Sequence, residues 1–190
     1  MSGAEPGFTT ARLTVQPATI ADAPFIHALW TDPRVMTFVG FPRGLPITLA
    51  EVEARLTHAQ AYPGGRLLSA RLNTTNEPIG HLKLAWPDAQ GIAEPDIKLL
   101  PEYWRMGYGR ELWLALVAYQ FQHTGCQIVQ ATPNVANAGS VRLQEVAGLR
   151  RVNVALYEFP ETMRAYTSPV PHYVYQLTRE RWIAQSRANM

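Results

Sequence analysis

A long apolar segment in the second half of the sequence constrains the fold more than any other feature. From Gly107 to His123, apolar residues occur nearly all around the helical period, as expected of a helix buried against a sheet. Strands are predicted on both sides of it, at 92–100 and at 127–132, with a glycine-containing turn before the helix. A strand, a helix and a strand in this order predict a parallel crossover.

The other periodic segments predict a single α/β (α+β) fold. Short, turn-rich connections join the strands predicted at 66–72, 79–86 and 92–100, which indicates an antiparallel meander. Further elements are strands at 12–16, 151–157 and 172–177, and helices that begin at Thr19, at Thr48 (through Ala59 to Pro63), at Asn137 and around Trp182. We therefore predict a mixed, largely antiparallel sheet with helices on both faces.

Length and charge limit the domain count and the classes of partner. The 190 residues fit one core, and we expect a flexible start at residues 1–10 followed by a single domain at 11–190. The formal charge is only +2 and the basic residues are scattered, so neither nucleic acid nor a membrane surface is expected as a partner. The sequence lacks a signal-peptide pattern and a membrane-spanning stretch, which favours a cytoplasmic location.

Cysteine and histidine usage argues against redox and metal chemistry. Cys126 is the only cysteine, and because it precedes an apolar strand it is expected to be a small buried side chain rather than a nucleophile. The five histidines show no metal-ligand spacing with one another or with Cys126, so no metal site is predicted.

A glycine turn stands where the first crossover strand leads into the long helix. Gly107 and Gly109 allow close backbone approach to an anion beside the positive end of the helix dipole, and Arg105 and Arg110 add positive charge. A turn shaped only for packing explains these residues equally well when they are considered alone. No Lys-Ser or Lys-Thr follows and a third glycine is absent, which argues against a Walker loop and a dinucleotide-binding loop.

A second polar segment, from Thr132 to Arg142, leads from the end of a strand into a helix. Asn137 followed by Ser140 is typical of a helix cap and its neighbour. The same helix start can also contact a ligand, and the residues alone do not decide between the two roles.

Together these segments resemble the GNAT superfamily of N-acetyltransferases. The chain is most similar to the branch that acetylates the N-termini of ribosomal proteins, and the likeness spans nearly the whole sequence. Two ordered motifs at the family's spacing are more specific than either motif alone. The residues that carry the likeness are Thr10-Ala11-Arg12-Leu13, Asp32-Pro33-Arg34-Val35-Met36, Glu94, the stretch from Pro101 to Glu111, Asn137, Ser140, Arg142, Glu145 and Gly148-Leu149.

The resemblance implies that acetyl-CoA binds in a cleft where the strands at 92–100 and 127–132 splay apart. Separated strands leave backbone groups unpaired, and the amides of the pantetheine arm can satisfy them. The thioester carbonyl would lie near the backbone of Leu99 and Leu100, where an N–H can stabilise the oxyanion. The residues expected to bind the coenzyme are Leu99, Leu100, Arg105, Met106, Gly107, Tyr108, Gly109, Arg110, Asn137 and Arg142.

Two acidic residues on the strand that enters the cleft are candidates for the general base that an amine nucleophile needs. Glu94 is the first candidate by family position, and Asp96 lies on the same face of the strand. Both can equally be solvated residues or ion-pair partners, for instance of Lys98, and Glu158 is a weaker third candidate. Pro95 between them removes a ladder donor, so we expect a bulge there.

The resemblance also implies a role for Ser140, which would hydrogen-bond or protonate the departing thiolate. Many GNAT enzymes use a tyrosine after the second motif as the acid. Since this chain has Arg and Leu in that region, the alternatives are Ser140 and the more distant Tyr157.

The expected acceptor is a primary amine, and the branch resemblance makes a protein or peptide N-terminal amine the first choice. An α-amine with a pKa of about 8 loses its proton at modest cost. The alternatives are a small-molecule amine such as an aminoglycoside or a polyamine, and a non-catalytic acyl-CoA sensor. Self-association into a homodimer is a further expectation for the partners of this chain.

Overall fold

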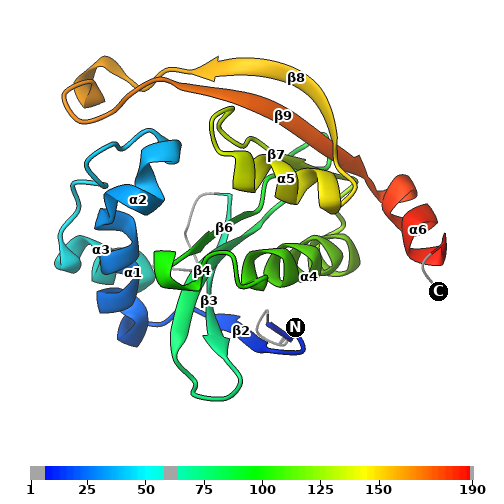
Figure 1. Ribbon diagram of the computed structural model, residues 1–190, viewed down its shortest axis with the longest axis horizontal. Coiled ribbons are helices and arrows are strands. Elements are labelled where there is room, and N and C mark those ends of the chain that lie inside the picture. Colours follow the sequence, from blue (N-terminus) through cyan, green and yellow to red (C-terminus); the bar gives the residue numbers. More distant parts are fainter. Residues whose placement is uncertain (1–6, 58–63, 189–190) are drawn as a thin grey trace.

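The computed structural model describes residues 7–57 and 64–188 and contains two hydrogen-bonded sheets (Figure 1). The first sheet is antiparallel and consists, in spatial order, of β1 (Phe8–Thr9), β2 (Leu13–Pro17), β3 (Gly65–Leu72), β4 (Pro78–Ala85) and β6 (Asp96–Leu99). The second sheet consists of β5 (Ile92–Ala93), β7 (Ile128–Ala131), β9 (Val170–Thr178) and β8 (Arg150–Tyr157). Its β5–β7 pair is parallel and its other pairs are antiparallel.

Helices cover both faces of the first sheet, as Figure 1 shows for α1 (Ala23–Thr31) and α4 (Tyr108–His123). α1 packs against β4 on one face together with α3 (Leu49–Thr57), and α4 packs against β4 and β6 on the other face. The predicted fold class is therefore confirmed. The remaining helical segments are η1 (Ile20–Asp22), α2 (Pro33–Met36), η2 (Thr37–Val39), η4 (Pro101–Tyr103), α5 (Ala138–Val146), η5 (Glu161–Met163) and α6 (Arg179–Ala188).

Two helix starts use the side chains that the sequence suggested. The Thr48 N–H and hydroxyl both donate to Glu51 at 2.7 Å, and the Glu51 N–H donates back to Thr48 Oγ1 at 3.3 Å, which completes a capping box. Asn137 caps α5 by accepting the Ser140 N–H at 3.0 Å. The expected continuation of the Thr48 helix through Ala59 to Pro63 lies outside the described residues.

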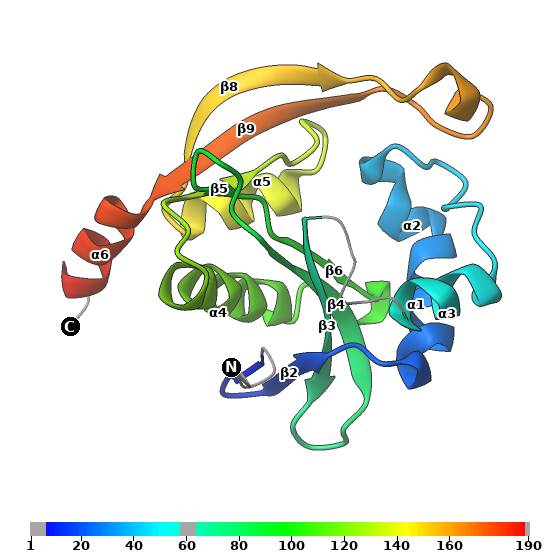
Figure 2. The same cartoon turned by 180° about the vertical axis from the view of Figure 1, so that it is seen from behind.

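The prediction of one continuous strand at 92–100 is wrong, because the chain changes sheets within it (Figure 2). β5 pairs with β7, whereas β6 pairs with β4. Glu94 and Pro95 lie between the two strands. Pro95 has no N–H, so the ladder toward β7 cannot continue through it. Instead of the expected bulge, the two sheets separate completely at this point.

Structure begins earlier than the expected flexible start at 1–10 allows. Phe8 and Thr9 form β1, which pairs with β2. The Phe8 ring packs on Tyr119 of α4 with the ring centroids 5.4 Å apart. The Thr10 hydroxyl donates to Glu111, also on α4, at 2.6 Å. Contacts with α4, which lies far along the chain, therefore order residues 8–10.

One buried polar side chain fixes α4 to the end of β4. Gln120 is fully buried, and its side-chain amide pairs with the backbone of Ala85 as an additional strand would. Gln120 Oε1 accepts the Ala85 N–H at 3.2 Å, and Nε2 donates to the Ala85 carbonyl at 2.6 Å. The buried apolar residues around it, including Trp113 and Phe121, exclude water from these bonds.

We expect Gln120→Leu to lower the free energy of unfolding by about 3 kcal/mol, because it leaves the Ala85 N–H and carbonyl buried without partners. Urea denaturation followed by circular dichroism measures this change. Gln122→Leu is the matched control, because Gln122 is exposed on the same helix. An equal effect of both substitutions would contradict the anchoring role of Gln120.

Candidate functional site

The loop before α4 presents unpaired backbone donors at the start of the helix. None of the amide N–H groups from Arg105 to Arg110 donates to an acceptor within the described residues. Gly107, the N-cap of α4, has a φ of 83°, and Arg105 has a φ of 62°. Left-handed residues alternating with right-handed ones turn successive N–H groups toward a common point and form an anion-binding nest. The positive end of the α4 dipole adds to this preference for an anion.

Arg105 adopts a conformation that glycine tolerates and other residues rarely adopt. In the described residues only Asn76 is a second non-glycine residue with positive φ. This conformation disfavours an L-residue by about 1–2 kcal/mol. The Arg105 side chain is exposed, as is that of Arg110, and neither forms an ion pair within the described residues. Both cations are thus available to an anionic ligand.

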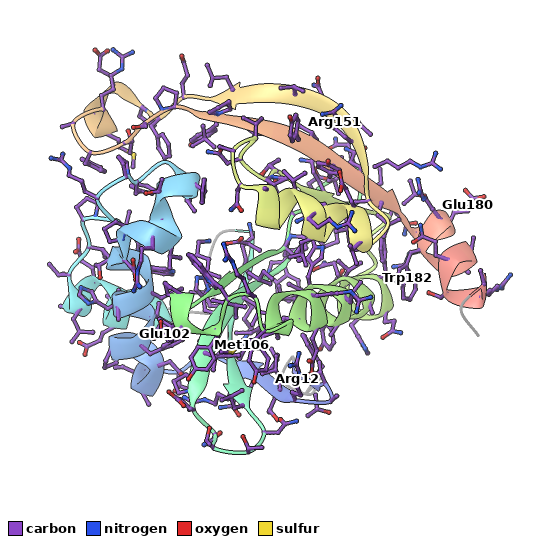
Figure 3. The ribbon with its side chains drawn as sticks, viewed as in Figure 1. Arg12, Glu102, Met106, Arg151, Glu180 and Trp182 are labelled. Atoms are coloured by element: carbon purple, nitrogen blue, oxygen red, sulfur yellow. The ribbon has the colours of Figure 1, made fainter. Side chains whose placement is uncertain are left out.

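Arg12, from the turn before β2, holds the loop in place (Figure 3). Its Nη1 donates to the Met106 carbonyl at 3.0 Å, and its Nε donates to Glu111 at 2.7 Å. Its guanidinium also lies over the Tyr108 ring, 4.3 Å from the centroid. Arg12 therefore joins the loop to the first turn of α4, and Glu111 orients Arg12.

The outer edge of β6 carries backbone groups that no strand pairs. The Leu100 N–H donates to the Ile79 carbonyl at 3.0 Å, so Leu100 is turned toward β4. Alternation along the strand directs the N–H groups of Ile97 and Leu99 away from β4, to the side from which β7 has separated. The Leu99 carbonyl on this edge accepts a hydrogen bond from Trp104 Nε1 at 2.8 Å. The Leu99 N–H, rather than that of Leu100, is the donor directed at the splay.

Glu94 and Thr132 meet at the point where the two sheets separate. Thr132 follows β7, Glu94 follows β5, and the Thr132 hydroxyl donates to Glu94 Oε1. Both side chains are partly buried. Glu94 forms no ion pair with any described residue, so its only side-chain partner there is a neutral hydroxyl.

Asp96, the second acidic candidate, has a cationic partner. Lys98 Nζ donates to its carboxylate. Burial acts to raise the pKa of Asp96, but the charge and hydrogen bond of Lys98 outweigh burial and leave the pKa below its usual value. The ion-pair alternative considered for Asp96 is therefore the one that the structure shows.

His81 lies beside this ion pair and is almost fully buried. Burial and, next, the positive charge of Lys98 lower the pKa of His81 to about 3, so the ring is neutral at physiological pH. Its Nε2 accepts a hydrogen bond from Trp30 Nε1 at 2.8 Å, so the ring proton resides on Nδ1. Nδ1 has no acceptor within the described residues. A neutral ring with this tautomer is a hydrogen-bond donor and cannot accept a proton readily.

The start of α5 lies after β7 and carries the second predicted group of residues. The Ser140 hydroxyl forms no hydrogen bond with the described residues, whereas its N–H is held by Asn137. Arg142 is exposed and forms only a long contact with Glu145, at 3.8 Å. The side chains of Ser140 and Arg142 are therefore not committed to structural contacts.

The tip of the β8–β9 hairpin reaches across to the segment after α2, as Figure 1 shows. The Ser168 N–H donates to the Gly40 carbonyl at 2.8 Å, and Phe41 packs edge-on against Phe159 with centroids 5.3 Å apart. Asn134, after β7, donates to the Phe38 carbonyl at 3.3 Å. These contacts tie the second sheet to the α1–α2 side. Phe41 and Trp30 are buried core residues, while Trp86 is half exposed.

Cys126 is buried, and its Sγ donates to the Ile128 carbonyl at 3.1 Å. Burial raises the pKa of its thiol, which confirms its expected character as a packed side chain. Among residues 7–57 and 64–188, no group of three or more acidic, histidine or cysteine side chains is placed to hold a metal ion. In the same residues, no helix combines the length and the apolarity needed to span a bilayer.

Comparison with known families identifies residues 12–150 as an acetyltransferase (GNAT) domain. The match covers more than half of the chain. The protein belongs to the GNAT acetyltransferase family. This GNAT enzyme is accordingly an acyl-CoA-dependent N-acetyltransferase, and the alternative of a non-catalytic sensor is not supported.

Individual proteins are similar to this chain at low sequence identity. The chain is similar to the FsC-acetyl coenzyme A-N(2)-transacetylase of Aspergillus fumigatus, with 27% identity over 98% of this chain and 82% of that protein. Among solved structures, spermidine N-acetyltransferase from Vibrio cholerae in complex with CoA and spermine has a TM-score of 0.77 and 19% identity, covering 92% of this chain and 99% of that one. An aminoglycoside acetyltransferase AAC(6')-Ib in complex with coenzyme A has a TM-score of 0.71 and 20% identity over 92% and 99% of the two chains. A structure described as a putative ribosomal-protein-serine acetyltransferase from Vibrio cholerae has a TM-score of 0.71 and 17% identity over 91% and 97%.

The geometry of this GNAT enzyme fits acetyl-CoA. A nest with two unpaired arginines suits a pyrophosphate, and an unpaired strand edge suits the amides of a pantetheine arm. The structure places Glu94 where the two sheets separate and the predicted loop after the end of β6, whereas Asp96 lies beside Lys98 and His81 on the α1 side of β6. The sequence alone gave no role to Thr132 or His81, and Arg12 entered only as part of the family resemblance. The contacts of these three residues join segments that are far apart in the chain, so no local pattern predicts them.

Arg105→Gly is expected to raise the free energy of unfolding by about 1 kcal/mol, because glycine adopts positive φ without strain. Arg110→Gly is the matched control and should instead lower it by about 1 kcal/mol, because Arg110 lies within the first turn of α4. Urea denaturation of both variants measures these opposite changes. A loss of stability in Arg105→Gly would contradict the conformation of this loop.

Proposed function

We propose that this enzyme transfers an acetyl group from acetyl-CoA to a primary amine that carries one positive charge, with a peptide N-terminal amine as the first candidate. The observation that supports this acceptor is the pairing of acidic residues on the α1 side of β6 and at the hairpin tip. Asp96 pairs with Lys98, Asp32 with Arg34 at 2.6 Å, and Glu161 with Arg164 at 3.1 Å. A polycationic acceptor would need several free carboxylates, and these three are already paired with the chain's own cations, whereas Glu94 and Glu158 form no ion pair within the described residues.

The coenzyme-binding roles follow from the unpaired groups. The N–H groups from Arg105 to Arg110, contributed in part by Met106, Gly107, Tyr108 and Gly109, bind the pyrophosphate, and the side chains of Arg105 and Arg110 neutralise it. The backbone at Leu99 and Leu100 lines the acyl end of the site. Asn137 and Arg142 contact the coenzyme arm from the start of α5.

The structure favours Glu94 over Asp96 as the general base. Asp96 has a lowered pKa and a bound cation, both of which reduce its affinity for a proton. Glu94 is held by the Thr132 hydroxyl, which orients its carboxylate without cancelling its charge. In this proposal Asp96 neutralises the positive charge of Lys98, which would otherwise repel a cationic acceptor amine.

Acetyl-CoA supplies the acetyl group as a thioester. As the acceptor nitrogen bonds to the acetyl carbon, Glu94 takes the proton that the amine loses, directly or through water. The Leu99 N–H donates to the acetyl oxygen as it gains charge. The Ser140 hydroxyl donates a hydrogen bond to the sulfur as the carbon–sulfur bond breaks, and the departing thiolate takes up its proton from water; this hydroxyl is uncommitted and suited to the role.

A small-molecule amine is the second candidate acceptor. It is favoured by the named relatives, one an FsC N(2)-transacetylase and the others acting on spermidine and aminoglycosides. The peptide acceptor is supported instead by the sequence resemblance and by the distant likeness to a ribosomal-protein-serine acetyltransferase.

Glu94→Gln is expected to lower kcat by about 100-fold or more while acetyl-CoA affinity stays within twofold, because it removes a general base and leaves the nest intact. Asp96→Asn should lower kcat by less than about tenfold, since Asp96 acts through Lys98. Steady-state kinetics and calorimetric titration with acetyl-CoA measure the two effects. A fully active Glu94→Gln enzyme would exclude Glu94 as the base.

Thr132→Val should lower kcat with little change in KM, and Thr132→Ser should restore it.

The acceptor is tested by incubating the enzyme with acetyl-CoA and three matched panels: peptides of varied N-terminus, polyamines, and aminoglycosides. We expect mass spectrometry to show acetylation of peptide α-amines, with kcat/KM at least about tenfold above that for polycations. N-terminally blocked peptides that contain lysine are the control for side-chain acetylation. Activity confined to polyamines or aminoglycosides would contradict the peptide acceptor.

A further inference from the structure

Lysine is rare in this chain, and both of its lysines lie at one place in the fold. Among the 17 lysine and arginine residues only Lys83 and Lys98 are lysines, and they lie on the paired strands β4 and β6. His81 lies opposite Lys98 and accepts a hydrogen bond from Trp30 of α1. Leu67 lies opposite Lys83 and belongs to the same buried apolar cluster as Trp30. Since opposed residues share a face of a sheet, both lysines project to the α1 side.

The two ammonium groups differ in their partners. Lys98 pairs with Asp96, and its side chain is only 14% exposed. Lys83 also lies opposite Asp96, but its side chain forms no hydrogen bond or ion pair with any described residue. One carboxylate therefore faces two cations, and one positive charge is left without a partner. Because Lys83 is partly buried, this uncompensated charge favours an anionic ligand.

Lys83 lies close to Glu94, the proposed general base. Its strand partner Asp96 is two residues from Glu94 in the sequence. Two residues of an extended chain span about 7 Å, and directly opposed strand residues lie about 5 Å apart. The ammonium group at the end of the long Lys83 side chain is therefore within reach of a ligand whose amine is at Glu94. This region offers a base to an amine and, beside it, a cation to an anionic group.

We propose that Lys83 selects acceptor peptides whose second residue is Asp or Glu. The inference rests on the proposed function, in which a peptide N-terminal amine is acetylated. In an extended peptide, the α-amine and the side-chain carboxylate of a second-residue Asp lie about 6–7 Å apart. The carboxylate carbon of a free amino acid lies only about 2.5 Å from its amine, which is too short a spacing. The peptide places its amine at Glu94 and its carboxylate at Lys83.

The same cation acts against other amines. A polyamine, or a peptide with Lys as its second residue, brings a second ammonium group against Lys83. Asp96 cannot compensate this charge fully, because it is already paired with Lys98. Like-charge repulsion therefore disfavours these acceptors. Lys83 holds a part of the acceptor remote from the reacting nitrogen and takes no part in proton transfer, so it determines specificity.

Steady-state kinetics on matched peptides test this selection. The peptides differ only in their second residue, which is Asp, Asn or Lys. We expect the wild-type kcat/KM to be about tenfold higher for the Asp peptide than for the Asn peptide, and lowest for the Lys peptide. Lys83→Met should remove this preference, mainly by raising KM for the Asp peptide. Lys83→Glu should reverse it in favour of the Lys peptide, and Lys83→Arg, which keeps the charge, should retain it.

Arg187→Met is the matched control, because it removes one positive charge from an exposed position on α6, far from α1 (Figure 1). It should leave the peptide preference unchanged. Calorimetric binding of acetyl-CoA shows that each variant is folded. Equal use of the Asp and Asn peptides by the wild-type enzyme, or a preference that survives in Lys83→Met, would overturn the role of Lys83. An enzyme that acetylates no peptide at all would instead show that the proposed peptide acceptor is wrong, and this inference would fall with it.

Chemical labelling tests the contact without turnover. Lys83 and Lys98 are the only lysines, so an amine-reactive reagent followed by mass spectrometry reports on each separately. With CoA present, saturating Nα-acetylated product peptide with Asp as its second residue should slow the labelling of Lys83 by about threefold or more relative to the Asn peptide. Lys98, held by Asp96, is the internal reference and should be labelled equally in both. Equal labelling of Lys83 with the two peptides would contradict the contact.

Discussion

The absence of an N–H on Pro95 is the constraint on which the site depends. A strand that ran unbroken from Ile92 to Leu99 would pair with β4 on one side and β7 on the other and leave no backbone group for a ligand. With Glu94 and Pro95 between β5 and β6, pairing to β7 stops after Ala93. The strand edges beyond that point become the binding surface for an extended, amide-rich molecule. The Glu94–Thr132 hydrogen bond lies where the separation begins.

A splayed pair of strands is useful only if the anion-binding loop is held in a fixed position beside it. Three contacts fix this position. Gln120 anchors α4 to the end of β4, Trp104 binds the Leu99 carbonyl, and Arg12 binds the Met106 carbonyl. The loop can therefore keep Arg105 in a left-handed conformation that is unfavourable for that residue alone. Rigid surroundings convert a local conformational cost into a preorganised set of N–H donors.

The electrostatics of the site separate two carboxylates that the sequence offers as candidate bases. Glu94 and Asp96 are two residues apart, yet one is bound by a neutral hydroxyl and the other by an ammonium group. Thr132 follows β7 and Lys98 lies in β6 itself, and these two partners set the different suitability of the carboxylates as bases. Neutral, buried His81 is excluded as a base by its lowered pKa, although histidine is often the first residue considered for such a role.

The sequence by itself determined the order of the elements, the helix caps at Thr48 and Asn137, the buried helix α4 and the glycine turn before it. These features depend on neighbours within a few residues, where periodicity and capping chemistry act directly. Only the tertiary structure decided that residues 92–100 change sheets and that residues 8–10 are ordered against α4. It also decided that the N–H of Leu99 rather than that of Leu100 faces the splay, and that Glu94 is bound by the distant Thr132. These outcomes depend on contacts between elements that are distant in sequence. They also depend on the side of a strand on which its partner lies. A local sequence pattern predicts neither.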